Sequence, residues 1–442
     1  MKTNLSLLLR PLFVAVSSML FAAGVAPSAC AASFRGLGDL PGSNFVSIAR
    51  AVSADGKVVV GYSSSSSGFQ AFRWTATTGM VGLGDLPGGS FTSYANAVSA
   101  DGSVVVGSSS SSNGTQAFRW TQATGMVGLG DLPGGNQGSL ASGVSADGSV
   151  IVGESCSALS GTRREAFRWT ATEGMIGLGD LAGGDFDSVA YGVSADGAVI
   201  VGYSSSSNAT FAGAEAFRWS QATGMAALGD FPGGYFNSIA YGISADGLVA
   251  VGRGYSGAYA LSTHEAFRWT AGSGLVPLGF LPCFDWTVAR AASADGSVIV
   301  GDPEMDPSDC AFIWDATRGI RNLREVLTTD LGLNLAGWQL KTARGISGDG
   351  NTIVGYGINP AGQTEAWIAN LKPPSLAISR APNHIILMWE TNVSGFVVEQ
   401  TSSLSASSVW IAVTEPVFVL GDQYVVTDSF TQSAAFCRLR KP

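Results

Sequence analysis

A short stretch ending in Asp-Gly and a valine-rich run occurs seven times, and it constrains the fold more than any other feature of the chain. Its fullest form is AVSADGSVVVG, at residues 97–107. The aspartates of the copies follow one another at intervals of 46 to 54 residues: Asp55, Asp101, Asp147, Asp196, Asp246, Asp295 and Asp349. A period of this length indicates a repeat architecture in which each unit is one supersecondary structure that packs on the next.

Each unit contains four short runs with strand character. In the unit at residues 94–132 the runs are 94–98, 104–106, 117–120 and 126–132. Asp101-Gly102 predicts a two-residue hairpin between the first two. The second run is β-branched and apolar on both faces, which is typical of a covered strand. Phe118 and Trp120 stand two residues apart, so they share a face. Four strands per unit predict the radially repeated antiparallel sheets of a β-propeller.

The two ends of the repeat region predict how the array closes. Residues 34–40 copy the fourth strand but precede the first unit, whereas the last unit, 343–371, has only the first three strands. Pairing 34–40 with 365–371 completes seven sheets and leaves no open sheet edge. An open solenoid would need polar capping repeats instead. We therefore expect an all-β fold, a seven-bladed β-propeller closed by an N-terminal strand, with bulky Phe and Trp side chains between the blades.

The first 31 residues are typical of a secretory signal peptide. Lys2 and Arg10 precede an apolar run, and Ala29-Cys30-Ala31 is a small-residue cleavage site. The run is short for a membrane span. We expect a secreted protein, extracellular or periplasmic, with no transmembrane segment after signal cleavage. The net charge of −9 disfavours nucleic acid as a partner, because binding to phosphate backbones needs a basic surface.

The repeat region, 32–371, is followed by a different kind of sequence. Lys372-Pro373-Pro374 marks a linker, because prolines interrupt regular structure. Residues 375–442 lack the repeat and contain five apolar runs with strand character, at 385–389, 396–400, 410–413, 424–427 and 435–439. Several short strands in a tail of this length predict a small β-sandwich.

Three segments of the units carry a family resemblance: the Asp-Gly stretch, the Ala-Phe-Arg-Trp of the third strand, and the Gly-Leu-Gly-Asp-Leu of the fourth. Through them residues 34–371 resemble the HAF-repeat family of extracellular bacterial proteins. This chain departs from the family in having Gln or Glu, not His, before Ala-Phe, at Gln70, Gln116, Glu165, Glu215 and Glu265. The tail resembles fibronectin-type-III-like modules through Trp389, 396–399, Trp410 and 436–439. The resemblance implies an exported repeat protein and carries no catalytic residues.

The sixth unit contains the candidate site residues. Its loops place Cys283 and Cys310 on the same face as the other variable loops, and export permits a disulfide between them. Asp285 and Trp286 are ligand-binding candidates on that face. The acidic residues Asp302, Glu304, Asp306 and Asp309 are calcium-ligand candidates, although their spacing is not that of an EF-hand. Calcium is the one cofactor that the sequence suggests.

Catalytic machinery is not evident in the sequence. Only His264 and His384 exist, in different parts of the chain, so a Ser-His-Asp triad has few ways to form. Paired acids for glycoside hydrolysis stay open, because their separation is a three-dimensional property. Our first hypothesis is a non-enzymatic surface interaction or adhesion scaffold whose partner is a protein or a glycan at the cell surface. The alternative is a carbohydrate-binding lectin or a glycosidase that works from the variable-loop face.

Overall fold

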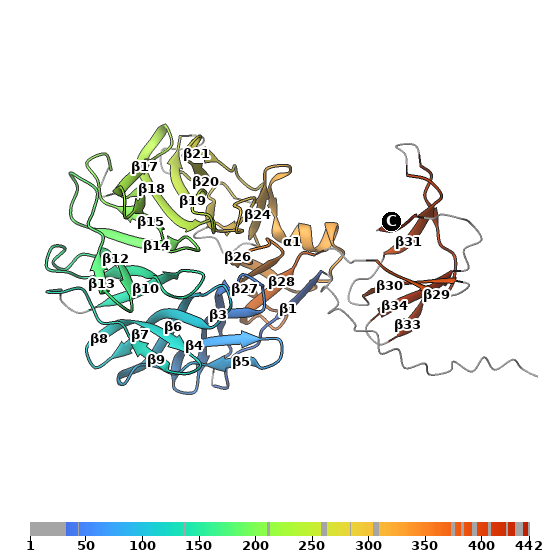
Figure 1. Ribbon diagram of the computed structural model, residues 1–442, viewed down its shortest axis with the longest axis horizontal. Helices are drawn as coiled ribbons and strands as arrows, with labels where there is room; N and C mark the ends of the chain where they lie inside the picture. Colours follow the sequence, from blue (N-terminus) through green and yellow to red (C-terminus); the bar gives the residue numbers. More distant parts are fainter. Residues whose placement is uncertain are drawn as a thin grey trace, which may run out of the picture.

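The structure is a computed structural model that describes residues 32–42, 44–135, 138–209, 213–257, 263–282, 284–303, 309–372, 376–381, 384–390, 396–404, 408–420, 423–428 and 436–440. These residues form an all-β protein of antiparallel sheets, as predicted. In Figure 1 the sheets of the repeat region follow one another around a common centre, from blue through green and yellow to orange.

Seven four-stranded sheets lie within the described part of the repeat region. The first three sheets are β2 (Ser47–Val52), β3 (Val58–Ser65), β4 (Gly68–Thr75) and β5 (Gly79–Gly82); β6 (Gly88–Val98), β7 (Val104–Ser111), β8 (Gly114–Thr121) and β9 (Gly125–Gly128); β10 (Ser139–Val144), β11 (Ile151–Ser155), β12 (Glu165–Thr170) and β13 (Gly174–Gly177).

The next three sheets are β14 (Ser188–Val193), β15 (Val199–Ser204), β16 (Glu215–Ser220) and β17 (Gly224–Gly229); β18 (Gly233–Ile243), β19 (Ala250–Ser256), β20 (Thr263–Thr270) and β21 (Gly274–Pro277); β22 (Val288–Ala292), β23 (Val298–Asp302), β24 (Phe312–Asp315) and β25 (Gly319–Asn322). The seventh combines both ends of the repeat region: β26 (Gln339–Ile346), β27 (Thr352–Ile358), β28 (Thr364–Asn370) and β1 (Ser33–Gly36).

Strand β1 pairs antiparallel with β28, from Ser33 opposite Asn370 to Gly36 opposite Trp367. Just after β1, the amide of Leu37 donates a hydrogen bond to the carbonyl of Ala366 at 2.9 Å. The ring of Phe34 lies 5.1 Å from that of Trp338, edge to face. Arg35 reaches the neighbouring sheet, where its guanidinium lies 4.4 Å from the ring centre of Trp74.

The recurring Ser-Ala-Asp-Gly sequence has a role for each residue. The hydroxyl of Ser99 accepts a hydrogen bond from the amide of Val104 at 2.9 Å and donates one to Asp101 at 2.7 Å. Gly102 has a φ of +73°, a conformation that favours glycine. Because Ser99 also donates its own amide to Val104, the hairpin loop has four residues, and the prediction of a two-residue turn was wrong. The Asp-Gly copies therefore act as turns.

The alanine of this turn links each sheet to the next. The amide of Ala54 donates to the carbonyl of Ala100 at 3.0 Å, and the same bond runs from turn to turn through Ala146, Ala195, Ala245, Ala294 and Gly348. Gly348 in turn donates to the carbonyl of Ala54 at 3.0 Å. We call this circle of seven backbone hydrogen bonds the turn belt. It satisfies backbone groups that the hairpins leave unpaired.

The apolar core lies between neighbouring sheets, as the third-strand pattern predicted. Phe118 of β8 is fully buried and packs on Val58, Val60 and Ala71 of the preceding sheet. Burial of one such ring contributes roughly 2–3 kcal/mol. The third strands supply a fully buried ring in every sheet: Phe72, Phe118, Phe167, Phe217, Phe267, Phe312 and Trp367.

A short helical segment precedes the last sheet. It comprises α1 (Leu323–Glu325) and the π-helical turn η1 (Val326–Asp330). The side chain of Asn322 caps it by accepting hydrogen bonds from the amides of Arg324 at 2.9 Å and Glu325 at 3.3 Å. The segment begins directly after β25, where Asn322 supplies the cap.

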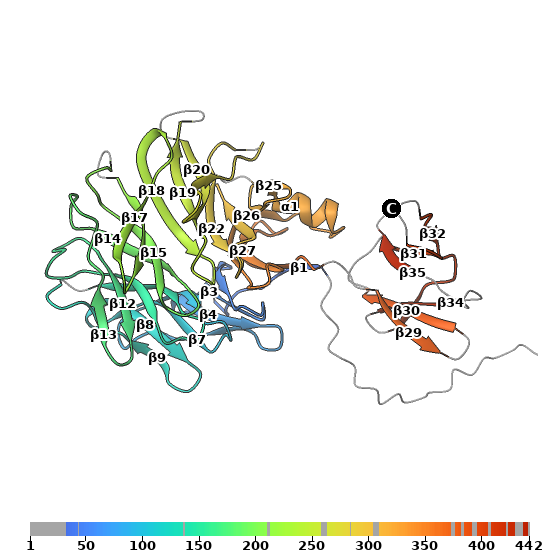
Figure 2. The same cartoon turned by 45° about the horizontal axis from the view of Figure 1, so that its top comes forward.

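The tail contains two packed sheets. One consists of β29 (Ala377–Ala381), β30 (His384–Glu390), β34 (Gln423–Asp428) and β33 (Phe418–Leu420). The other consists of β32 (Ile411–Ala412), β31 (Val397–Thr401) and β35 (Phe436–Arg440), and Figure 2 shows the two sheets one above the other. Leu387 and Trp389 of the first sheet pack on Val398 of the second. Two sheets with a shared core agree with the predicted sandwich.

Candidate functional site

The first strand of every sheet in the repeat region carries a β-bulge at the same position. In β2 the pairing register shifts between Ala49 and Ala51, which leaves Arg50 without a partner on β3. A bulge of this kind turns the extra residue away from the sheet. The seven bulge residues are Arg50, Asn96, Ser142, Tyr191, Tyr241, Arg290 and Arg344.

All seven bulge residues line one cavity of about 240 Å³, which we call the central channel. Each first strand contacts the first strand of the next sheet, and β26 contacts β2. The channel wall therefore takes one variable side chain from each sheet. Three neighbouring sheets contribute arginines: Arg290, Arg344 and Arg50. The two sheets that precede the sheet of Arg290 contribute tyrosines, Tyr191 and Tyr241.

Arg290 and Arg344 share a buried carboxylate. Asp302, at the end of β23, is 1% exposed and accepts three hydrogen bonds from Arg290, of which the shorter two join Nε to Oδ2 at 3.1 Å and Nη2 to Oδ1 at 3.0 Å. The Nε of Arg344 lies 3.8 Å from the same carboxylate. Removal of Asp302 would weaken the pairing of both arginines in a place where charges are poorly solvated.

Arg50 lacks such a partner. It is half-buried, donates a hydrogen bond to the side chain of Asn96, and lies over the rings of Tyr62 at 4.9 Å and Tyr94 at 5.9 Å. None of the carboxylates in the described ranges forms an ion pair with it. Burial, together with the charge of Arg344, lowers the pKa of Arg50 despite the neighbouring tyrosines. The channel thus holds a partly desolvated cation that has spare hydrogen-bond donors.

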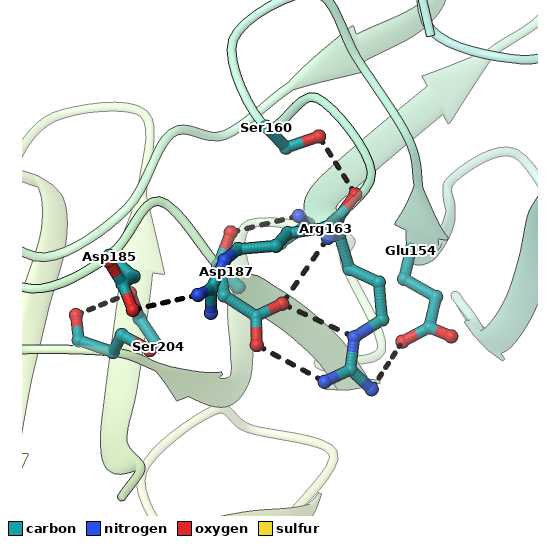
Figure 3. Close-up of polar contacts among 10 residues, drawn as sticks. Glu154, Ser160, Arg163, Asp185, Asp187 and Ser204 are labelled. Carbon is teal, nitrogen blue, oxygen red and sulfur yellow. Dashed lines mark hydrogen bonds and ion pairs between the residues drawn. The ribbon is translucent and has the colours of Figure 1, made fainter. Parts of the chain in front are cut away.

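Figure 3 shows an acidic network that includes Glu154 and Asp187. Arg164 holds Asp187 with two hydrogen bonds of 3.2 Å, and its Nη1 is 3.7 Å from Glu154. Its guanidinium also lies 5.6 Å from the ring centre of Tyr203. Burial raises the pKa of Glu154, although Arg164 opposes this. Burial likewise raises the pKa of Tyr191.

Another cavity lies outside the central channel. It measures about 490 Å³ and lies beside α1 and η1, with Ile320, Arg321 and Asp330 in its wall. Arg321 pairs with Asp315 at 3.0 Å and with Asp330 at 2.9 Å. Both acids neutralise Arg321, so this arginine, unlike Arg50, is already paired with carboxylates.

The predicted ligand-binding residues of the sixth unit lie outside the central channel. Asp285 is exposed, and Trp286 packs against His264 at 5.2 Å and Phe284 at 6.2 Å between ring centres. Of the two histidines in the chain, His264 is 7% exposed and lies within hydrogen-bond distance of Arg253. Trp286 therefore belongs to a packed aromatic cluster.

The predicted calcium ligands are only partly described. Glu304 and Asp306 lie outside the described residues, as does Cys283. Asp302 pairs with Arg290, whereas Asp309 pairs with Arg324 at 2.7 Å, so these two carboxylates face different arginines. Within the ranges that the structure describes, no three His, Cys, Asp or Glu side chains come together as metal ligands. Cys310 is disulfide-bonded, and its pairing with Cys283 stays a prediction.

The bulge residues were missed in the sequence because they share no residue type. The residue before the bulge is Ala in all seven copies and the residue after it is Ala or Gly, whereas the bulge residue itself is Arg, Asn, Ser or Tyr. A single variable position inside a constant repeat is itself a signal, because a purely structural position would hardly vary in charge and size.

No family model and no curated protein matches the chain. Among solved structures it is similar to TolB from Acinetobacter baumannii, at 13% identity and a TM-score of 0.37 over 59% of this chain and 61% of that one. The putative TolB from Agrobacterium tumefaciens has 10% identity and a TM-score of 0.33, over 66% of this chain and 89% of that one. The Dos1 propeller has 9% identity and a TM-score of 0.38, over 78% and 95%.

Across the described ranges, none of the helical segments has the length and apolar character that crossing a bilayer requires.

Proposed function

We propose that this chain is an exported, non-enzymatic interaction scaffold whose seven sheets are the blades of one closed β-propeller, and that its central channel binds an anionic group of the partner. The pairing of β1 with β28 and the turn belt support the closed form. The resemblance to the HAF-repeat family and the predicted secretory signal further support export.

A single observation carries the binding function: Arg50 is a half-buried guanidinium with no carboxylate partner among the described residues. Leaving a partly buried charge uncompensated costs free energy, and an anion that docks against it removes that cost. Arg344 adds a second positive charge close by, which lowers the pKa of Arg50. A carboxylate, sulfate or phosphate group fits the planar donors of arginine.

The experiment is a calorimetric titration of the mature protein with citrate, sulfate and acetate at low ionic strength. We expect at least one anion to bind, and Arg50→Gln to weaken that binding by roughly tenfold or more, because a hydrogen bond to a charged group is worth about 1.5–3 kcal/mol. Arg73→Gln is the matched control, since Arg73 donates to the carbonyl of Gly102 at a hairpin turn. Absence of any anion binding, or equal affinity in the Arg50 variant, would refute the proposal.

A second candidate function, a lectin or glycosidase, is favoured by the acidic network. Glu154 has a raised pKa and Asp187 is ion-paired with Arg164, and two acids in contrasting environments are typical of glycoside hydrolysis. Incubation with a polysaccharide panel tests this candidate. If the wild type releases reducing ends and Glu154→Gln does not, the protein is a glycosidase and the non-enzymatic proposal is wrong.

A further inference from the structure

A second cavity opens beside the central channel and shares part of its wall. It measures about 360 Å³, and Arg50 and Asn96 line both cavities. We call it the hydroxyl pocket, because its other wall residues include Thr92, Ser108 and Thr115 from β6, β7 and β8. Its volume falls within the range of small-molecule sites, which is about 300–1,000 Å³.

Three hydroxyls of this pocket are available to a ligand. Thr92, Ser108 and Thr115 make no side-chain hydrogen bond to any other described residue, and Ser108 is only 3% exposed. Their neighbour Ser109 differs, because its hydroxyl accepts a hydrogen bond from the amide of Leu86 at 2.9 Å and so fixes the backbone at Leu86. Hydroxyls that have no protein partner can both donate to and accept from the hydroxyl groups of a ligand.

An aromatic group forms one side of the pocket. Tyr94 lines it and packs edge to face on Tyr62 with 4.8 Å between ring centres. Phe69 adjoins both rings and is 40% exposed, and Leu140 adds an aliphatic surface. Aromatic rings next to hydrogen-bonding side chains suit a ligand with one apolar face and several polar groups.

We infer that the hydroxyl pocket takes a sugar acid, with the carboxylate against Arg50 and the sugar hydroxyls against Thr92, Ser108 and Thr115. A neutral sugar would leave the guanidinium unpaired. A bare phosphate or sulfate would leave the three hydroxyls and the apolar wall unused. A uronic acid satisfies all of them with one ring. This inference rests on the proposed anion-binding function and specifies its ligand class.

The test is a titration with trigalacturonate and trimannuronate, each compared with its methyl ester, which keeps the hydroxyls and removes the charge. We expect the acid to bind at least about tenfold more tightly than the ester. Thr92→Val and Ser108→Ala should each weaken uronate binding by roughly three- to tenfold and leave citrate binding unchanged. Ser66→Ala is the control, because Ser66 is exposed and lines neither the channel nor the pocket.

The outcomes separate this inference from the proposed function. Citrate binding that depends on Arg50, combined with uronate binding that ignores Thr92 and Ser108, overturns the sugar-acid assignment and leaves anion binding intact. Equal affinity for the acid and its ester overturns the assignment as well. If citrate, sulfate and the uronates all fail to bind, the proposed function and the inference fall together. Unchanged melting temperatures of the variants show that each remains folded.

Discussion

The amide of Gly348 donates a hydrogen bond to the carbonyl of Ala54 at 3.0 Å, although the two residues belong to the last and the first Asp-Gly turns of the chain. This bond has the same donor and acceptor positions as the six others of the turn belt. A repeat array that stayed open would leave these two groups apart and unpaired. The relationship explains why the turn residue before the aspartate is small in every copy: its backbone must approach the next turn closely.

Gly102→Ala is expected to destabilise the protein more than Gly125→Ala. Both glycines have a positive φ, +73° and +67°, so both substitutions strain the backbone. A Cβ at Gly102 would also lie 2.4 Å from Val58 of the neighbouring sheet, whereas nothing lies within 4 Å of one at Gly125. We expect the Gly102 variant to lose about 1–3 kcal/mol more in chemical denaturation. Equal losses would show that the turn does not pack on the next sheet.

Phe34→Ala is expected to lower the free energy of unfolding by about 2 kcal/mol. Phe34 is half-buried and packs on Trp338 and on Trp367, 5.9 Å away between ring centres, so its truncation removes apolar contacts that hold β1 on the last sheet. Phe418→Ala is the control, since Phe418 is 61% exposed. A loss no larger than that of the control would mean that β1 adds little to stability.

Asp302→Asn is expected to destabilise the protein by about 3 kcal/mol, because it removes the buried charge that Arg290 and Arg344 share. Asp185→Asn removes an exposed ion pair with Arg163 and should cost less than about 1 kcal/mol. Thermal melting with and without a chelator decides between this role and the predicted calcium site. A lower melting temperature after chelation would assign Asp302 to a metal.

The free energy of unfolding should depend on pH through the ionisation of Asp230. Burial raises the pKa of this carboxyl to about 6, and nearby Glu215 adds to the shift despite backbone hydrogen bonds from Phe231 and Asn237. The native state therefore holds a proton that the unfolded state releases near pH 4, so stability falls as the pH rises through 4 to 6. Relative to Asp230→Asn, the wild type should lose about 1–2 kcal/mol between pH 4 and pH 7. A constant difference between the two proteins over this range would contradict the shift.

The repeat made much of this fold predictable from the sequence. The repeat period predicted where the strands lie, and the β-branched runs predicted the covered second strands. The spacing of two between Phe118 and Trp120 predicted which face of the third strand packs between sheets. The orphan strand before the first unit predicted the pairing of β1 with β28. These features depend on local patterns, which recur and reinforce one another along the chain.

The candidate site was less accessible to sequence analysis. The bulge at Arg50 arises from a register shift against β3, which no local pattern encodes. The residue at the bulge was not considered among the candidate site residues of the sequence. Trp286 was chosen for its residue type and its loop, whereas its packing against His264 joins that loop to strand β20. Contacts between side chains that are far apart in the sequence can be identified only in the structure.

The most direct test of the account is amide hydrogen exchange of the mature protein, followed by mass spectrometry at the two ends of the repeat region. In a closed propeller the amides of Leu37 and Gly348 are hydrogen-bonded to Ala366 and Ala54, and they should exchange as slowly as those of Ala100 and Ala146 in the interior of the array. Rapid exchange of residues 33–37 and 348 in the folded protein would contradict the closed form and, with it, the central channel.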